Sequence, residues 1–272
     1  MRSKITIRQL EDHREFLACE TLEKDTWGQS FAECVPPSIL MVSQKIGGVT
    51  AGAFNEKGEL IGFVYGLTGL MDGKPVHWSH MLAVQPEYRD ENLGARLKRY
   101  QADTVKKLGI ETMYWTFDPL VSKNAHLNLN KLGVEIDKYV PDMYIDGNES
   151  DLHRGIGMDR FIVRWDLNKR RDTEQSSKSI EPEGNKSIVV NTKINEETKL
   201  ILVEPIFVEE EFVRIEIPLD INEIQKQSLE LAGQWRSNTR QSFLHYLDKN
   251  YELTGFYRDK TDRCYYILNK LY

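Results

Sequence analysis

A histidine in an apolar strand is the first candidate for chemistry in this sequence. His80 lies in a run of mostly apolar residues that reaches Val84, and Pro86 follows. The unperturbed pKa of histidine is about 6.5, so much of the side chain is neutral near pH 7 and can accept a proton. We therefore expect His80 to be a general base, with His77 as the reserve candidate. A buried histidine that bonds main-chain groups beside Trp78 is the structural alternative.

The segment after this strand has the features of an anion-binding loop. Arg89 to Ala95 reads Arg-Asp-Glu-Asn-Leu-Gly-Ala, and apolar residues recur at three- and four-residue spacing from Leu93 to Leu108, which predicts a helix. The first N–H groups of a helix have no partner within it, and the helix dipole places positive charge there. A strand, a loop and a helix start therefore predict a phosphate or pyrophosphate site.

The strand also predicts which side chains lie together. Period-2 alternation would place His80, Leu82 and Val84 on one face, and the residues between them on the other.

The elements that position these residues follow a definite order. The patterns of apolar residues, caps and turns predict strands at 4–8, 49–54, 60–67, 112–117 and up to Val84, and helices after Asp12, after Pro37, over 93–108 and over about 124–132. A turn at 55–58 would join two of the strands into a hairpin.

From residue 4 to about 133, this order resembles the GNAT (GCN5-related N-acetyltransferase) superfamily. The cofactor loop of that family reads Gln/Arg-x-x-Gly-x-Gly/Ala. Arg89 and Gly94 match it, whereas Asn92 stands where the first glycine is usual. We expect Asn92 to adopt a left-handed conformation, which asparagine tolerates better than most residues. The resemblance implies an α/β (α+β) fold with a mixed central sheet flanked by helices.

Three parts are predicted along the chain. The GNAT acetyltransferase domain would span 1–168, closed by a strand at 160–167. A linker at 169–186 has scarcely an apolar residue. A smaller C-terminal α/β subdomain would span 187–272 and contain one long helix over about 221–249.

The resemblance implies acetyl-CoA as co-substrate and no metal. The pantetheine amides would pair with the main chain of Leu82 and Val84. The pyrophosphate would lie over the loop residues, which are Arg89, Asp90, Glu91, Asn92, Leu93, Gly94 and Ala95. Asn124 and Asn128 could line the CoA arm, or they could be ordinary exposed helix residues.

The catalytic groups implied by the resemblance are only partly present. His80-Met-Leu-Ala-Val84 is similar to the His-Val-Leu-Ala-Val strand of the arylalkylamine N-acetyltransferases, whose histidine is implicated in deprotonating the amine. Many GNAT enzymes protonate the departing thiolate with a tyrosine, but Leu129 stands at that position. Tyr139 or Tyr144 could replace it, although packing is the alternative role for both.

Two functions are therefore compared. The expected one is an acyl-CoA-dependent N-acetyltransferase that acts on a small-molecule or peptide amine. The alternative is a non-catalytic acyl-CoA-binding or interaction protein on the same scaffold. Purified protein that releases thiol from acetyl-CoA with an amine would favour the enzyme.

The composition of the chain favours some classes of partner and some cellular locations over others. The formal net charge of −6 argues against nucleic-acid binding. No apolar run resembles a signal peptide or a membrane span, so we expect a cytoplasmic protein without a membrane partner. The cysteines, Cys19, Cys34 and Cys264, lack the spacing of a zinc site. A homodimer is kept among the expected assemblies.

Overall fold

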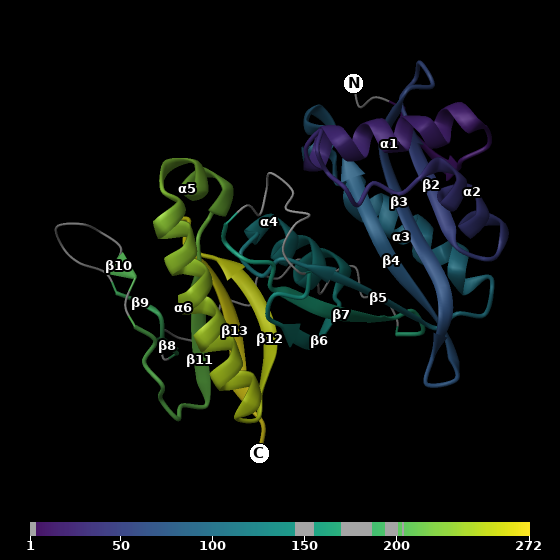
Figure 1. Ribbon diagram of the computed structural model, residues 1–272. Helices are drawn as coiled ribbons and strands as arrows, with labels where there is room; N and C mark the ends of the chain where they lie inside the picture. Colours follow the sequence, from purple (N-terminus) through teal and green to yellow (C-terminus); the bar gives the residue numbers. More distant parts are fainter. Residues whose placement is uncertain (1–3, 145–154, 170–186, 194–200, 203) are drawn as a thin grey trace. The chain divides into compact units, whose positions relative to one another are not determined.

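The computed structural model describes residues 4–144, 155–169, 187–193, 201–202 and 204–272 (Figure 1). The chain divides into two compact units. The first comprises Met1–Thr116, Asp146–Leu152 and Arg164–Arg170. The second comprises Phe117–Ile145, His153–Val163 and Arg171–Tyr272. The linker predicted at 169–186 lies, apart from its first residue, outside the described residues.

A mixed sheet is the main element of the fold, as predicted. Among the described residues it has seven strands in the order β1-β2-β3-β4-β5-β7-β6. The strands β1 to β4 pair antiparallel, and β4 and β5 pair parallel. The bounds are β1 (Thr6–Gln9), β2 (Val49–Phe54), β3 (Leu60–Met71), β4 (Lys74–Val84), β5 (Thr112–Phe117), β6 (Glu135–Val140) and β7 (Arg160–Asp166).

Local sequence signals explain where the helices of the first unit begin. The Asp12 carboxylate caps α1 by accepting hydrogen bonds from the N–H groups of Arg14 and Glu15, at 2.8 and 3.0 Å. Glu15 in turn accepts a bond from the N–H of Glu11. Pro37 begins α2, where its missing N–H is harmless. The helices are α1 (His13–Trp27), α2 (Pro37–Lys45), the 3-10 helix η1 (Pro86–Glu91) and α3 (Leu93–Lys106).

Helices pack on both faces of the strands in the first unit (Figure 1). On one face α1 and α2 cover a core that includes Phe16, Leu22, Leu40, Phe63, Tyr65, Met81 and Ala83. On the other face lies α3. A Cβ added at Gly62 would be 3.3 Å from side-chain atoms of both Leu97 and Val84, which places these two side chains together on the α3 face.

The buried face of α3 differs from the predicted one. Leu108 is 57% exposed, whereas Lys98 and Gln101 are buried. The helix ends at Lys106, and Gly109 adopts a positive φ of 78° just beyond it. Leu108 therefore lies beyond the end of the helix and does not continue its buried face.

The second unit contains a four-stranded sheet in the order β12-β13-β11-β8, with α6 packed against it. Its core is aromatic, because the rings of Phe161, Phe243 and Tyr266 lie within 5.6 Å of one another, centroid to centroid. The elements are α4 (Ser122–Ala125), the π-helix η2 (His126–Leu132), β8 (Ile188–Val189), β9 (Thr192–Lys193), β10 (Ile201–Leu202), β11 (Phe212–Ile217), α5 (Ile221–Gln227), α6 (Leu229–Asp248), β12 (Tyr251–Arg258) and β13 (Cys264–Lys270).

Two predicted helices are interrupted in the second unit. The long helix expected over 221–249 breaks at Ser228, whose main chain is extended and whose hydroxyl accepts the N–H of Leu231 at 3.1 Å. Ser228 thereby starts a new helix, as an N-cap does. The helix expected over 124–132 is a short α4 followed by a π-helix that ends at Gly133.

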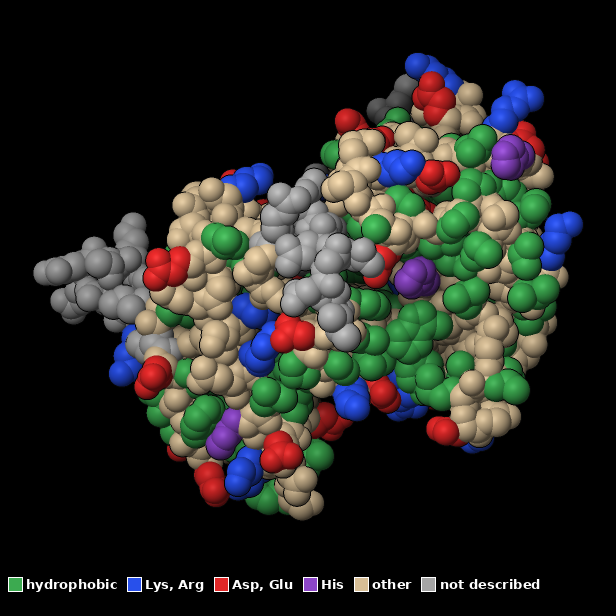
Figure 2. Space-filling view, viewed as in Figure 1, with side chains coloured by type: hydrophobic (Ala, Val, Ile, Leu, Met, Phe, Trp, Pro, Cys, Tyr) green, Lys and Arg blue, Asp and Glu red, His purple; other side chains and the backbone are tan. Residues whose placement is uncertain are grey.

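Hydrophobic side chains also reach the surface of the first unit, where they are visible in Figure 2. The most exposed of them on α2, directly after it and on β3 are Ile39, Val42, Ile46 and Leu70. In the described part of the chain, no helix is long and apolar enough to cross a membrane.

Candidate active site

The loop after β4 has a main-chain conformation that would suit an anion, and we call it the anion cradle. Asn92 is left-handed, with φ 56° and ψ 21°, so the predicted conformation is confirmed. It follows the right-handed turn of η1, and a right-handed residue followed by a left-handed one turns successive N–H groups toward one point. The first bond of α3 runs from the N–H of Arg96 to the carbonyl of Asn92 at 3.1 Å. The N–H groups of Leu93, Gly94 and Ala95 therefore precede the helical ladder.

Arg89 is held where β4 ends. Its Nε donates a hydrogen bond to the carbonyl of Val84 at 3.0 Å, and the side chain remains exposed. Asp90 and Glu91 contribute main chain to the last turn of η1. The loop predicted from the sequence is thus a compact structure with a cation at its start.

The edge of β4 that faces β5 is open beyond Trp78. Paired residues are His77 with Met113 and Trp78 with Tyr114, and no further pair joins the two strands among the described residues. The N–H of Gln85 bonds the carbonyl of Ile61 on β3.

Alternation along β4 then shows which residues face that open edge. Because Gln85 directs its N–H toward β3, Leu82 and Val84 direct their polar main-chain groups away from β3. These are the two residues predicted to bind the pantetheine amides.

A β-bulge at His80 changes the predicted faces of β4. Tyr65 lies opposite Met81 and Gly66 lies opposite Ser79, so His80 is an extra residue in β4. Tyr65 and Gly66 are neighbours and point to opposite faces, and therefore Ser79 and Met81 do so too. The predicted set of His80, Leu82 and Val84 on one face is wrong, because simple alternation does not survive a bulge.

Contacts on each face agree with this correction. The hydroxyl of Ser79 accepts a hydrogen bond from Lys98 of α3 at 2.7 Å. Met81 packs into the core under α1 and α2. The ring of His80 meets the edge of Tyr65, with centroids 6.1 Å apart and an interplanar angle of 78°. His80 therefore belongs to the α1 and α2 face.

His80 can exchange protons with solvent or substrate. Its side chain is exposed, although one edge packs on Tyr65. Surrounding protein atoms lower the pKa of His80 from its ordinary value, and the carboxylate of Glu33 opposes that shift. The neutral, proton-accepting form therefore predominates near pH 7.

His77 has a different environment. It is fully buried, and its Nδ1 lies 3.0 Å from the hydroxyl of Thr68. That hydroxyl donates its proton to the carbonyl of Gly47 at 2.6 Å, so Nδ1 of His77 is the donor to Thr68. Burial lowers the pKa of His77 to about 3. A neutral, buried ring fits a structural role better than proton transfer.

The comparison with known families agrees with this geometry. Residues 16–133 match the model of the Acetyltransferase (GNAT) family. The chain carries a GNAT acetyltransferase domain. The search of curated proteins finds no match to the chain.

Solved structures resemble part of the chain at low identity. A Salmonella typhimurium protein described as an acetyltransferase, solved with its cofactor acetyl-CoA, is 16% identical, with a TM-score of 0.47 over 61% of this chain and 96% of that chain. The ribosomal-protein-S18-alanine N-acetyltransferase from Escherichia coli is 17% identical, with a TM-score of 0.46 over 62% of this chain and 97% of that chain.

The remaining predicted residues belong to the second unit. Asn124 is part of α4 and half-buried, and Asn128 is buried in η2. Tyr139 donates its hydroxyl proton to Asp159, and burial raises its pKa far above the ordinary value. Tyr144 lies against the Arg160 guanidinium, 5.4 Å from the ring centroid. The sequence-based alternative, packing, therefore describes Tyr139 better than proton transfer.

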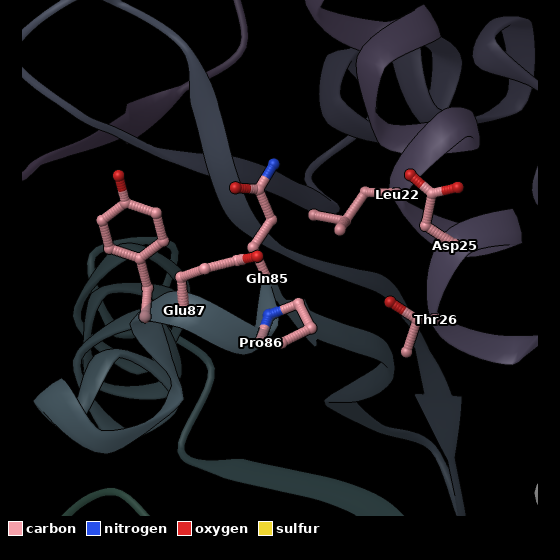
Figure 3. A pocket seen from close by; sticks show the side chains of 7 residues that line it. Leu22, Asp25, Thr26, Gln85, Pro86 and Glu87 are labelled. Carbon is pink, nitrogen blue, oxygen red and sulfur yellow. The ribbon is translucent and has the colours of Figure 1, made fainter.

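The structure contains a pocket in the GNAT domain that the sequence did not predict. It has a volume of about 450 Å³ and lies between the last turns of α1 and the start of η1. In Figure 3 the α1 side chains face those of the β4–η1 turn. The lining residues are Leu22, Asp25, Thr26, Gln85, Pro86, Glu87 and Tyr88. No local motif marks this pocket, because it joins segments about sixty positions apart.

Lys98 was also missed, although the sequence contains a signal for it. Ala95, Lys98, Ala102 and Val105 recur at the spacing of one helix face, and three of them are apolar. A lysine in such a stripe is either buried or at its edge. The structure shows that it is buried, with 3% of its surface exposed.

Proposed function

We propose that this GNAT domain transfers the acetyl group of acetyl-CoA to the amine of a small molecule or a peptide. The observation that carries the proposal is the anion cradle at Asn92. It follows the end of β4, and the edge of β4 that faces β5 is open beyond Trp78. A CoA thioester needs both features, an anion site for the phosphates and main-chain donors and acceptors for the pantetheine amides.

The cradle and the strand edge would bind different parts of CoA. The pyrophosphate would accept hydrogen bonds from the N–H groups of Leu93, Gly94 and Ala95, with Arg89 nearby as a cation. The pantetheine arm would run along β4 past Val84 and Leu82, in the direction of His80. Gly94 suits the closest approach because it has no Cβ to crowd the phosphates.

His80 would then act as the general base. Amine attack requires a neutral nitrogen, and His80 is exposed at the bulge where β4 and β5 part. A main-chain N–H group of β4 would stabilise the negative charge that develops on the thioester oxygen.

Acidic residues on the same side of the sheet favour a cationic acceptor. Asp25 and Glu87 line the pocket beside η1, and Glu33 is close enough to influence the pKa of His80. Carboxylates would repel the phosphates of CoA and attract a protonated amine. The pocket is thus better suited to part of the acceptor than to the cofactor.

The non-catalytic alternative has two observations in its favour. Leu129 replaces the usual tyrosine, and the Tyr139 hydroxyl is engaged by Asp159. Thiol release from acetyl-CoA in the presence of an amine panel separates the two functions. Release above the amine-free rate supports the enzyme, and CoA binding without any release supports the alternative.

Calorimetry with CoA tests the cradle directly. Gly94→Glu should abolish measurable binding, because its carboxylate would face the phosphates. Gly233→Glu is the matched control, since Gly233 lies within α6 and a Cβ there meets nothing within 4 Å. Equal CoA affinity in wild type and Gly94→Glu would remove this loop from consideration.

We also propose a cytoplasmic location and keep the homodimer as a prediction. The free cysteines, Cys19, Cys34 and Cys264, suit a reducing compartment. Sedimentation velocity of the full chain tests the assembly, and a single species at the mass of one chain at every concentration would contradict a dimer.

A further inference from the structure

Helix α3 buries a lysine against the two central strands. Lys98 Nζ donates a hydrogen bond to the Ser79 hydroxyl at 2.7 Å, and it lies 3.9 Å from the ring centroid of Trp115. Within the described part of the chain, no carboxylate forms an ion pair with Lys98. Lys98 helps to lower the pKa of His77 on β4.

The two contacts of Lys98 mark the point where β4 and β5 part. The last pair of the ladder is Trp78 with Tyr114. Ser79 and Trp115 are the next residue of each strand. Lys98 therefore touches both strands at the first position beyond the ladder, on the face that α3 covers.

A buried lysine at this position lowers the stability of the folded protein, which favours a functional reason for its presence. Burial holds the pKa of Lys98 well below its ordinary value, because the charged form is desolvated. Methionine would fill similar space next to Trp115 without a polar group to desolvate.

We propose that Lys98 stabilises the negative charge that develops on the sulfur of CoA during acetyl transfer and donates a proton to that sulfur. This inference rests on the proposed function. The phosphates would lie at Gly94 and the arm would run along β4 past Leu82, so the sulfur at the end of the arm reaches the region of Ser79. Lys98 is four residues after Gly94 on the same helix and meets the arm at that end.

The proton balance of the step closes within the site. The neutral acceptor nitrogen attacks the thioester carbon, and the C–N bond forms. The C–S bond then breaks, and its electron pair remains on sulfur. His80 takes the proton that the nitrogen releases. Lys98, which carries a proton in the complex with acetyl-CoA, gives that proton to the thiolate, and the proton on His80 returns to Lys98 through water. The products are an amide and a thiol.

Lys98 would also take over the role of the usual tyrosine, which is to protonate the departing thiolate. Leu129 has no proton to give, and Tyr139 donates its own to Asp159. The bulge places the two proton-transfer groups on opposite faces of β4, with His80 on the α1 and α2 face and Lys98 on the α3 face. Deprotonation of the acceptor and protonation of the thiolate would then use separate groups.

Titration of bound CoA tests the proposal without an acceptor. The ultraviolet absorbance of the thiolate gives the pKa of the CoA thiol in complexes with wild type, Lys98→Met and the exposed-loop control Lys57→Met. We expect the thiol pKa in wild type and in the control to be at least one unit lower than in Lys98→Met, which is a tenfold larger thiolate fraction. CoA affinity should remain within a few-fold in all three.

Three other results would overturn the proposal, and they are distinguishable. Equal thiol pKa values with CoA bound to every variant would leave the proposed function intact and exclude Lys98. Lower stability of Lys98→Met with an unchanged thiol pKa would assign Lys98 a structural role; if that variant does not fold, Lys98→Gln replaces it. No CoA binding to wild type would overturn the proposed function itself.

Discussion

The Arg236 guanidinium and the Asp118 carboxylate form a buried ion pair in which Nη2 and Oδ2 are 2.6 Å apart. Both side chains are less than 5% exposed. Arg236 Nε also donates to the carbonyl of Ile156 at 3.1 Å. Asp118 begins the turn after β5, where its other oxygen accepts the N–H of Leu120 at 2.8 Å. A residue of α6 therefore holds the turn that leads into α4.

Loss of Arg236 should lower the free energy of unfolding substantially. Arg236→Met leaves a buried carboxylate, and removal of one partner of such a pair costs about 3–5 kcal/mol of unfolding free energy. We expect the lower end, because Arg160 lies 3.6 Å from the same carboxylate. Urea denaturation measures the loss. Lys226→Met breaks an exposed pair with Glu223 and is the control. A loss as small as that of the control would contradict the prediction.

Glu23 should make stability depend on pH. It is fully buried in α1, and burial raises its pKa to about 7 from the ordinary 4.5. The folded protein therefore holds a proton that the unfolded chain releases, so stability is highest at low pH and falls as pH rises from 4.5 to 7. The slope is about 1.4 kcal/mol per unit within that window.

The variant Glu23→Gln isolates this dependence. Its side-chain oxygen can still accept the N–H of Val35, which bonds Glu23 at 2.7 Å. Urea unfolding at pH 5 and pH 8 should show that the variant gains stability relative to wild type as pH rises. An equal difference at both pH values would contradict the assigned pKa.

Asn92 should tolerate glycine and reject β-branched residues. Its left-handed conformation costs ordinary residues about 1–2 kcal/mol, and β-branched ones suffer most. Asn92→Gly should retain CoA affinity within a few-fold. Asn92→Val should lose at least tenfold, because the cradle must change shape. Calorimetry with CoA decides, and equal affinities would show that the left-handed turn does not shape the site.

Gly66 should not accept a methyl group. A Cβ there would lie 2.3 Å from Nε2 of His77 and 2.7 Å from the carbonyl of Trp78. Gly66→Ala should therefore lose about 1–3 kcal/mol of unfolding free energy, as overpacked sites do. Gly69→Ala is the control in the same strand, since a Cβ at Gly69 meets nothing within 4 Å. Equal stabilities of the two variants would refute the crowding.

His80→Gln should lower turnover once an acceptor is known. Loss of a general base typically costs about 10²–10⁴ in rate, while CoA binding should remain nearly intact. The pKa of His80 lies below its ordinary value. The midpoint of the acid limb in the wild-type pH–rate profile should therefore lie below about pH 6.5. His13→Gln, on the exposed start of α1, is the control. Turnover within a few-fold of wild type and an unchanged profile would refute the role.

The sequence by itself determined the features that depend on near neighbours. The Asp12 cap, the hairpin at 55–58 and the left-handed Asn92 follow from the chemistry of residues within a few positions, and all three are present. The order of strands and helices up to Gly133 follows from the period of apolar residues, which a single strand or helix imposes on its own sequence.

Only the tertiary structure decided the faces of β4 and the burial of Lys98. The bulge at His80 arises because β3 pairs with β4 in a register that skips this residue, and a strand's own alternation does not reveal its partner's register. Lys98 is buried because Ser79 and Trp115 meet it from two strands, and Asp118 is buried because Arg236 comes from 118 positions away. Such contacts depend on which distant segments pack together, and that choice is made by the whole chain.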